Sequence, residues 1–153
     1  MAPPASTSKE TKILRLLVPV DGSANSDRAV KHVIELAKGL PSVEVLVLNV
    51  QPAVTYVELI LGPTQRVIEQ WSQRAGHDAA RSAGVLLDAA GLAYTLHVEQ
   101  GEPGETIARC AQQWNCDLVV MGTRGMGLIR TLVLGSVATK VIHAAAMPVT
   151  LVR

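Results

Sequence analysis

The apolar residues of the chain fall into short runs that are typical of buried strands. The clearest runs are 13–20, interrupted only by Arg15, and 43–50, which ends just before Pro52. Apolar runs of this length, bounded by turn residues, are typical of strands with both faces covered. The shorter segments 93–99, 117–121 and 148–152 complete a set of five predicted strands.

Between these runs, apolar residues recur three and four positions apart, which indicates helices. One predicted helix covers 28–38, and Asn25, Ser26 and Asp27 before it are candidate N-caps. Further helices are expected over 105–115 and 135–146, and one long helix from Pro63 or Thr64 to Ala90. The alternation of strands and helices predicts an α/β fold with a mainly parallel sheet. The segment 51–63 has no clear pattern.

The composition fits one domain with an aliphatic core. The chain has 153 residues, 48% of them hydrophobic but only 3% aromatic, and it contains no Phe. A core of Val, Leu, Ile and Ala suits a parallel sheet covered by helices. Residues 1–12 are rich in Pro, Ser and Thr, so we expect a disordered leader followed by a single domain over 13–153.

The charge and the apolar runs exclude several classes of partner. The formal net charge is +1, without the basic patch of a nucleic-acid-binding protein. No apolar run is long enough to span a membrane. The leader lacks the apolar segment of a secretory signal, so a cytoplasmic location is expected. Cys110 and Cys116 are predicted to be reduced apolar side chains on opposite faces of one helix.

Two glycine-bearing turns are candidate ligand-binding segments. In an open α/β sheet, ligands bind beyond the carboxyl ends of the strands, where the strand order reverses. With the order 3-2-1-4-5, this point lies between the first strand, followed by Asp21-Gly-Ser23, and the fourth, followed by Gly122-Thr-Arg-Gly125. Gly135-Ser136 opens the last helix, whose free N–H groups suit a phosphate. Arg124 and Arg130 are candidate phosphate-binding cations.

On glycine spacing alone, a loop that only turns the chain is about as well supported as a loop that binds a ligand. The segment is not a P-loop, because Lys140 does not directly follow the second glycine, and a nucleophile elbow is also excluded. The four histidines are too dispersed for a metal site and are expected at the surface or in packing roles. Trp71 and Trp114 are expected to pack in the core. Glu102 and Glu105 are expected to begin a helix rather than to form a catalytic pair.

From residue 13 to 153 the chain resembles the universal stress protein family, in its single-domain, ATP-binding type. The resemblance rests on Leu-Val-Pro-Val-Asp-Gly-Ser at 17–23, on Val-Val-Met-Gly-Thr-Arg-Gly at 119–125, and on 134–141 and 147–152. The nucleotide motif of the family, G-x2-G-x9-G-[S/T], is matched by Gly122, Gly125, Gly135 and Ser136. Asn49 departs from the family, because many members have His there.

The resemblance implies a Rossmann-like five-stranded open sheet of order 3-2-1-4-5 with helices on both faces. It also implies an ATP site. In that site Asp21 lies beside the ribose and any phosphate-bound Mg²⁺, while Val20 and Val50 flank the adenine. The full set of implied binding residues is Pro19, Val20, Asp21, Val50, Met121, Gly122, Arg124, Gly125, Gly135, Ser136, Val137 and Ala138. Replacing Gly122 with Val is expected to abolish ATP binding and to leave the fold intact.

The function expected from this resemblance is an ATP-binding regulatory protein of the stress response with little or no turnover. The alternatives are a slow ATPase or phosphate-transfer enzyme, or a protein that binds AMP or cyclic AMP. An adenylate-transfer enzyme is disfavoured, because the loop from Asp21 to Ser26 lacks the glycine pair that it requires. A homodimer is expected to form through the C-terminal strand at 148–153.

Overall fold

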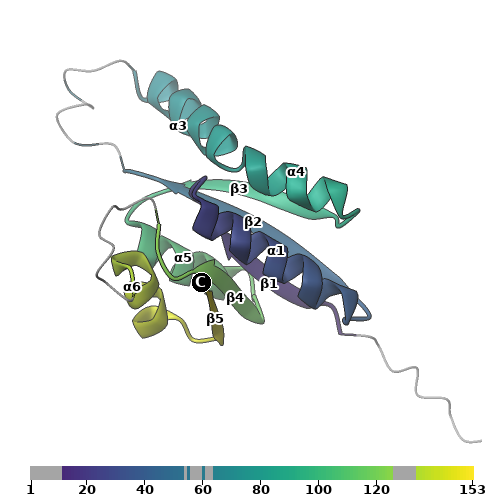
Figure 1. Ribbon diagram of the computed structural model, residues 1–153. Helices are drawn as coiled ribbons and strands as arrows, with labels where there is room; N and C mark the ends of the chain where they lie inside the picture. The colour runs from purple at the N-terminus through teal and green to yellow at the C-terminus, as the bar shows by residue number, and fades with distance from the viewer. Residues whose placement is uncertain (1–11, 54, 56–59, 61–63, 126–133) are drawn as a thin grey trace, which may run out of the picture.

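The computed structural model of the protein describes residues 12–53, 55, 60, 64–125 and 134–153 (Figure 1). Most of the predicted leader lies outside these residues, whereas Lys12 forms an ion pair with Asp117 at 2.5 Å. The strands are β1 (Leu14–Pro19), β2 (Val43–Gln51), β3 (Tyr94–Gln100), β4 (Leu118–Gly122) and β5 (Val149–Val152). The helices are α1 (Ala24–Lys38), α3 (Gln65–Ala79), α4 (Arg81–Ala89), α5 (Pro103–Gln113) and α6 (Ser136–Ala144).

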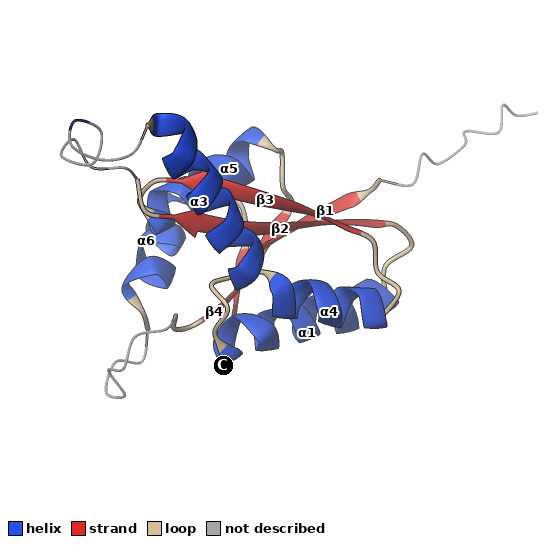
Figure 2. Ribbon diagram, turned by 90° about the horizontal axis from the view of Figure 1, so that it is seen from above, coloured by secondary structure: helices blue, strands red, loops and turns tan. Residues whose placement is uncertain are grey.

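The strands form one sheet of order β3-β2-β1-β4-β5, as predicted. Every neighbouring pair is parallel, so the sheet is wholly rather than mainly parallel. Helices α1, α3 and α4 lie on one face, and α5 and α6 lie on the other (Figure 2). The strand order reverses at β1, where the chain continues to β2 on one side and β4 lies on the other. This reversal leaves a crevice at the carboxyl ends of β1 and β4.

Two aliphatic cores hold the helices against the sheet. On one face, Leu16 and Val18 of β1 pack with Val30 of α1 and Leu87 of α4. On the other face, Leu17 of β1 packs with residues of α5 and α6. Because the middle strands are covered on both sides, their sequences are almost continuously apolar, as the sequence pattern indicated.

The long helix predicted up to Ala90 is instead two helices that meet at Ala80. Ala80 is 3% exposed and departs from helical geometry, with φ −87° and ψ −2°. The helix α3 packs on β2 and β3, whereas α4 packs on α1, where Ser82 donates to Asp27 at 2.8 Å. The kink at Ala80 lets the two segments follow these different surfaces, and apolar periodicity does not report such a change of direction.

Two further expectations are corrected by the structure. Cys116 is not on a helix with Cys110, because α5 ends at Gln113 and Cys116 lies in the turn before β4. Both cysteines are nevertheless free and buried in the same core, and burial raises the pKa of the Cys116 thiol to about 11. Trp71 on α3 is 61% exposed rather than packed in the core. Trp114 does pack against the core and stacks on His97, with ring centroids 4.3 Å apart.

No helix in the part of the chain that the structure describes is long and apolar enough to cross a membrane.

Candidate functional site

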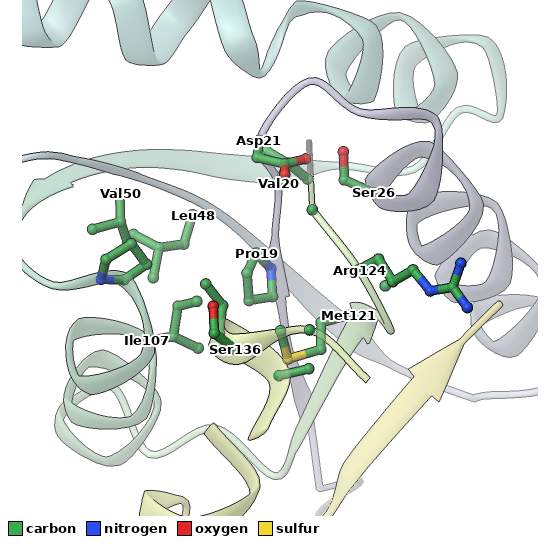
Figure 3. Close-up of a pocket in the computed structure, with 16 residues that line it drawn as sticks. Pro19, Val20, Asp21, Ser26, Leu48, Val50, Ile107, Met121, Arg124 and Ser136 are labelled. Atoms are coloured by element: carbon green, nitrogen blue, oxygen red, sulfur yellow. The ribbon is translucent and has the colours of Figure 1, made fainter. Parts of the chain in front are cut away.

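A cavity of about 500 Å³ opens at the carboxyl ends of β1, β2 and β4, beside the first turns of α1, α5 and α6 (Figure 3). Every residue that the resemblance assigned to the binding site lines this cavity: Pro19, Val20, Asp21, Val50, Met121, Gly122, Arg124, Gly125, Gly135, Ser136, Val137 and Ala138. Four more residues that the sequence analysis did not assign to the site complete the lining: Ser26, Leu48, Pro103 and Ile107. Leu48 could have been found, since it lies two positions before Val50 on the same strand face.

One part of the cavity wall is aliphatic. Leu48 and Val50 of β2 lie near Ile107 of α5 and Met121 at the end of β4 (Figure 3). Pro103 at the start of α5 completes this apolar wall. A slot lined by aliphatic side chains suits a flat ring that has polar edges.

The two turns that the sequence singled out meet in this cavity. The Asp21 carboxylate accepts from the Ser23 N–H through Oδ1 at 3.0 Å. Its Oδ2 would lie 2.7 Å from a Cβ added to Gly125, so a side chain at position 125 would displace the carboxylate. Gly22, between Asp21 and Ser23, has φ +81°, which favours glycine. The sharp turn after β1 therefore directs Asp21 toward the loop that follows β4.

The N-terminus of α6 provides main-chain donors to the cavity. Its N-cap, Gly135, has no side chain, whereas Ser23 caps α1 and Glu102 caps α5 with side-chain oxygens. The first intrahelical bond runs from Thr139 N–H to the Gly135 carbonyl at 3.0 Å. The N–H groups of Ser136, Val137 and Ala138 precede it and have no partner in the helix. These groups and the helix dipole suit an anion.

Thr123 fixes the position of the α6 N-terminus. Its carbonyl accepts from the Gly135 N–H at 2.7 Å, and its own N–H donates to the Val152 carbonyl of β5 at 2.9 Å. A Cβ on Gly135 would lie 3.2 Å from the Thr123 carbonyl oxygen, which is closer than a side chain ordinarily tolerates. A glycine here therefore allows α6 to begin directly against the end of β4.

Gly122 has a structural role that the sequence did not reveal. A Cβ at position 122 would lie 3.0 Å from both the Cβ and the carbonyl oxygen of Asn25, in the first turn of α1. A valine there would require the first turn of α1 to shift away from β4. The expectation that Gly122→Val leaves the fold intact stays a prediction, and this close approach counts against it.

The structure gives less support to the two arginines as phosphate-binding cations than to the main-chain donors of α6. Arg124 lines the cavity, but its side chain extends away from the aliphatic wall and from Ser136 (Figure 3). Arg130 lies outside the described residues.

Lys140 of α6 forms an ion pair with Glu102, the N-cap of α5, with 2.8 Å between Nζ and Oε1. The hydrogen bond from Lys140 lowers the pKa of Glu102, and the same bond raises the pKa of Lys140.

This ion pair holds α5 and α6 together at the edge of the cavity. Glu102 also accepts from the Glu105 N–H at 2.9 Å, which confirms that these two acids begin a helix. Among the described residues, no group of three or more His, Cys, Asp or Glu side chains is placed to hold a metal ion.

Comparison with known proteins agrees with this architecture. The sequence model of the Universal stress protein family matches residues 12–153. The chain belongs to the universal stress protein family. Universal stress protein MJ0531 of Methanocaldococcus jannaschii is 30% identical over 139 residues, which are 91% of this chain and 81% of that one. A universal stress protein of Mycolicibacterium smegmatis is 32% identical over 141 residues, and this chain spans only 47% of its length.

Solved structures, two universal stress proteins among them, share the fold. The structure of protein MJ0577 superposes with a TM-score of 0.73 at 25% identity, over 91% of this chain and 94% of that one. A universal stress protein in complex with cAMP gives a TM-score of 0.70 at 21% identity, over 92% and 97% of the two chains. The Archaeoglobus fulgidus protein in complex with dAMP gives 0.64 at 22% identity, over 94% and 99%.

Proposed function

We propose that this universal stress protein binds an adenine nucleotide, ATP in the first instance, in the cavity between β1 and β4. The observation that carries the proposal is the uncapped N-terminus of α6, which opens into a cavity with an aliphatic wall. The structural neighbours that hold cAMP and dAMP support an adenine nucleotide as the ligand class.

We propose a position for each part of the nucleotide from the residues that line the cavity. The adenine ring fits the aliphatic wall beside Val50, and the ribose lies near Asp21. The phosphates lie against Gly125 and the first N–H groups of α6, where the helix dipole is most favourable. Mg²⁺ would be held by phosphate oxygens and Asp21, as is usual for a cation that keeps most of its water.

We propose a regulatory role in the stress response with little or no turnover. Phosphoryl transfer requires a positioned attacking water and neutralised charge. Among the described lining residues, Asp21 is the one acidic side chain available for this purpose. A purified protein that hydrolysed ATP at about 1 s⁻¹, the low end for kinases, would contradict this role. A cytoplasmic location remains a prediction from the sequence.

We also propose that the protein is a homodimer in which the C-terminal residues 148–153 pair with a second copy. The strand β5 lies at one edge of the sheet, and all four of its residues are partly exposed. An open apolar edge of this kind is a template for strand pairing. Antiparallel pairing about a two-fold axis would close it in both copies at once.

Substitution of Ser136 tests the nucleotide site directly. Ser136 is the first residue of α6, where proline is well tolerated because its N–H has no partner in the helix. Gly135 before it is extended, with φ −75° and ψ 160°, which suits a residue that precedes proline. Ser136→Pro should therefore fold normally but lose one phosphate donor and the hydroxyl. We expect ATP affinity to fall by about 10- to 100-fold, the worth of a charge-assisted hydrogen bond.

Ser136→Ala is the matched control, because it removes the hydroxyl and keeps the main-chain donor. Isothermal titration calorimetry gives the affinities, and thermal unfolding without nucleotide verifies that both variants fold. Equal affinity for ATP in the wild type and in Ser136→Pro would exclude phosphate binding at α6.

A further inference from the structure

A buried amide interrupts the β1–β2 ladder beside the proposed adenine site. Asn49 is 3% exposed and follows four buried aliphatic residues of β2. A buried amide is costly unless it is hydrogen-bonded. Its Nδ2 donates to the Val20 carbonyl at 2.9 Å, and its Oδ1 accepts from Gln51 Nε2 at 2.7 Å. Both ends of the amide are therefore engaged.

The bond to Val20 replaces the next bond of the parallel ladder. The Val20 N–H donates to the Leu48 carbonyl at 2.8 Å, as the regular pattern requires. The following bond of that pattern would run from the Val50 N–H to the Val20 carbonyl. Among the described residues this bond is not made, and the Val20 carbonyl accepts from the Asn49 side chain instead.

The main-chain groups of Val50 consequently face the cavity. Neighbouring residues of a strand direct their main-chain groups to opposite sides, and the Gln51 carbonyl accepts from the Gly101 N–H on the β3 side. The Val50 N–H and carbonyl therefore point toward β1, beyond the point where β1 has ended. Val50 lines the cavity there. A donor and an acceptor on one residue can pair with an adenine edge, whose N1 accepts and whose N6 amino group donates.

We propose that Asn49 is a positioning residue for base selection: by holding the Val20 carbonyl, it keeps β1 from closing on Val50 and leaves the Val50 main chain to bind adenine. This inference rests on the proposed nucleotide site. The helix α3 supports the amide from behind, since a Cβ on Gly76 would lie 3.1 Å from Asn49 Oδ1. Without the Asn49 amide, the Val20 carbonyl has the Val50 N–H as its nearest alternative donor in the ladder.

The test compares AMP with IMP, in which N1 donates and position 6 accepts, the reverse of adenine. The wild type should prefer AMP by at least about tenfold, because the wrong base leaves polar groups unpaired. Asn49→Leu keeps a similar volume but loses the amide, and the preference should fall to about threefold or less. Leu87→Ala, in the same core layer but away from the cavity, is the control for lost stability and should retain the preference.

The outcomes separate this inference from the proposed function. A wild type that binds neither AMP nor ATP overturns both. A folded Asn49→Leu variant that keeps the full preference for AMP overturns the role of Asn49 and leaves the nucleotide site standing.

Amide exchange on the wild type tests the same point without any variant. The Val50 amide should exchange faster than that of Leu48 in the nucleotide-free protein and should slow when AMP is added. Equal protection of Val50 and Leu48 in the free protein would show that the ladder is closed, and it would overturn the inference.

Discussion

At the scale of single residues, the glycines after β4 have different tasks although they share one motif. Gly125 faces the Asp21 carboxylate, a flexible neighbour that can move aside. Gly122 faces the Cβ and the main chain of Asn25 in the first turn of α1, where the helix leaves less freedom to move. The motif therefore combines a position that shapes the cavity with a position that holds a helix against the sheet.

This difference predicts that Gly122→Ala lowers the stability of the fold itself. The added methyl group meets the Asn25 Cβ and carbonyl oxygen at 3.0 Å, and such overpacking costs about 1–3 kcal/mol in the free energy of unfolding. Gly39→Ala is the control, because the nearest atom there is the Leu36 carbonyl oxygen at 3.7 Å. Urea denaturation of the two variants measures the difference, and equal midpoints would contradict the prediction.

At the scale of elements, α3 approaches the sheet through a glycine. A Cβ on Gly76 would lie 2.4 and 2.7 Å from the two methyl carbons of Val98 on β3. Glycine weakens a helix by roughly 1 kcal/mol relative to alanine, so its presence inside α3 needs a packing reason. The contact with β3 supplies that reason, because any larger residue would lift α3 from the sheet.

A double-mutant cycle tests this contact. Gly76→Ala alone should destabilise the protein by about 1–3 kcal/mol through overpacking. In the background of Val98→Ala, which removes both methyl groups, the same change should cost clearly less, because the 3.1 Å approach to Asn49 Oδ1 is then the tightest contact that remains. Chemical denaturation of the four proteins gives the coupling energy. Strictly additive effects would show that Gly76 does not limit the approach of α3.

Elements with a local cause were predictable from the sequence, whereas those with a tertiary cause were not. The strand order, the α/β class and the meeting of Asp21 with Gly125 follow from apolar patterning, turn chemistry and the family resemblance. The break at Ala80 was missed because it depends on which surfaces α3 and α4 contact. The predicted start of α1, residue 28, lies four residues after the observed start at Ala24. The N-cap is Ser23 rather than one of the three polar residues after Ala24.

At the scale of the whole molecule, the free edge of β5 is the surface on which the proposed dimer depends. The carbonyls of Pro148 and Val152 accept from Val119 and Thr123, so these groups face β4. By alternation, the N–H of Leu151 faces the open edge of the sheet. Strand pairing with a second copy would use this outward row of main-chain groups.

Leu151→Pro should convert the dimer to a monomer, because it removes an outward donor and leaves the ladder with β4 intact. Leu151→Ala loses the same side-chain packing but keeps the donor, so it should remain dimeric at micromolar concentration. Sedimentation velocity distinguishes the two species. A monomeric wild type would exclude the dimer, and a dimeric Leu151→Pro variant would place the interface elsewhere.

The cavity brings together residues from 19–26, 48–50, 103–107, 121–125 and 135–138, so the segments that form its wall are spread over nearly the whole length of the chain. A ribosome must therefore translate most of the message before the binding site can exist. A ligand that occupies the finished site also stabilises the fold, by about 4 kcal/mol when its concentration exceeds the dissociation constant a thousandfold. With the proposed adenine nucleotide as that ligand, the nucleotide concentration would then set how readily the finished fold resists proteolysis.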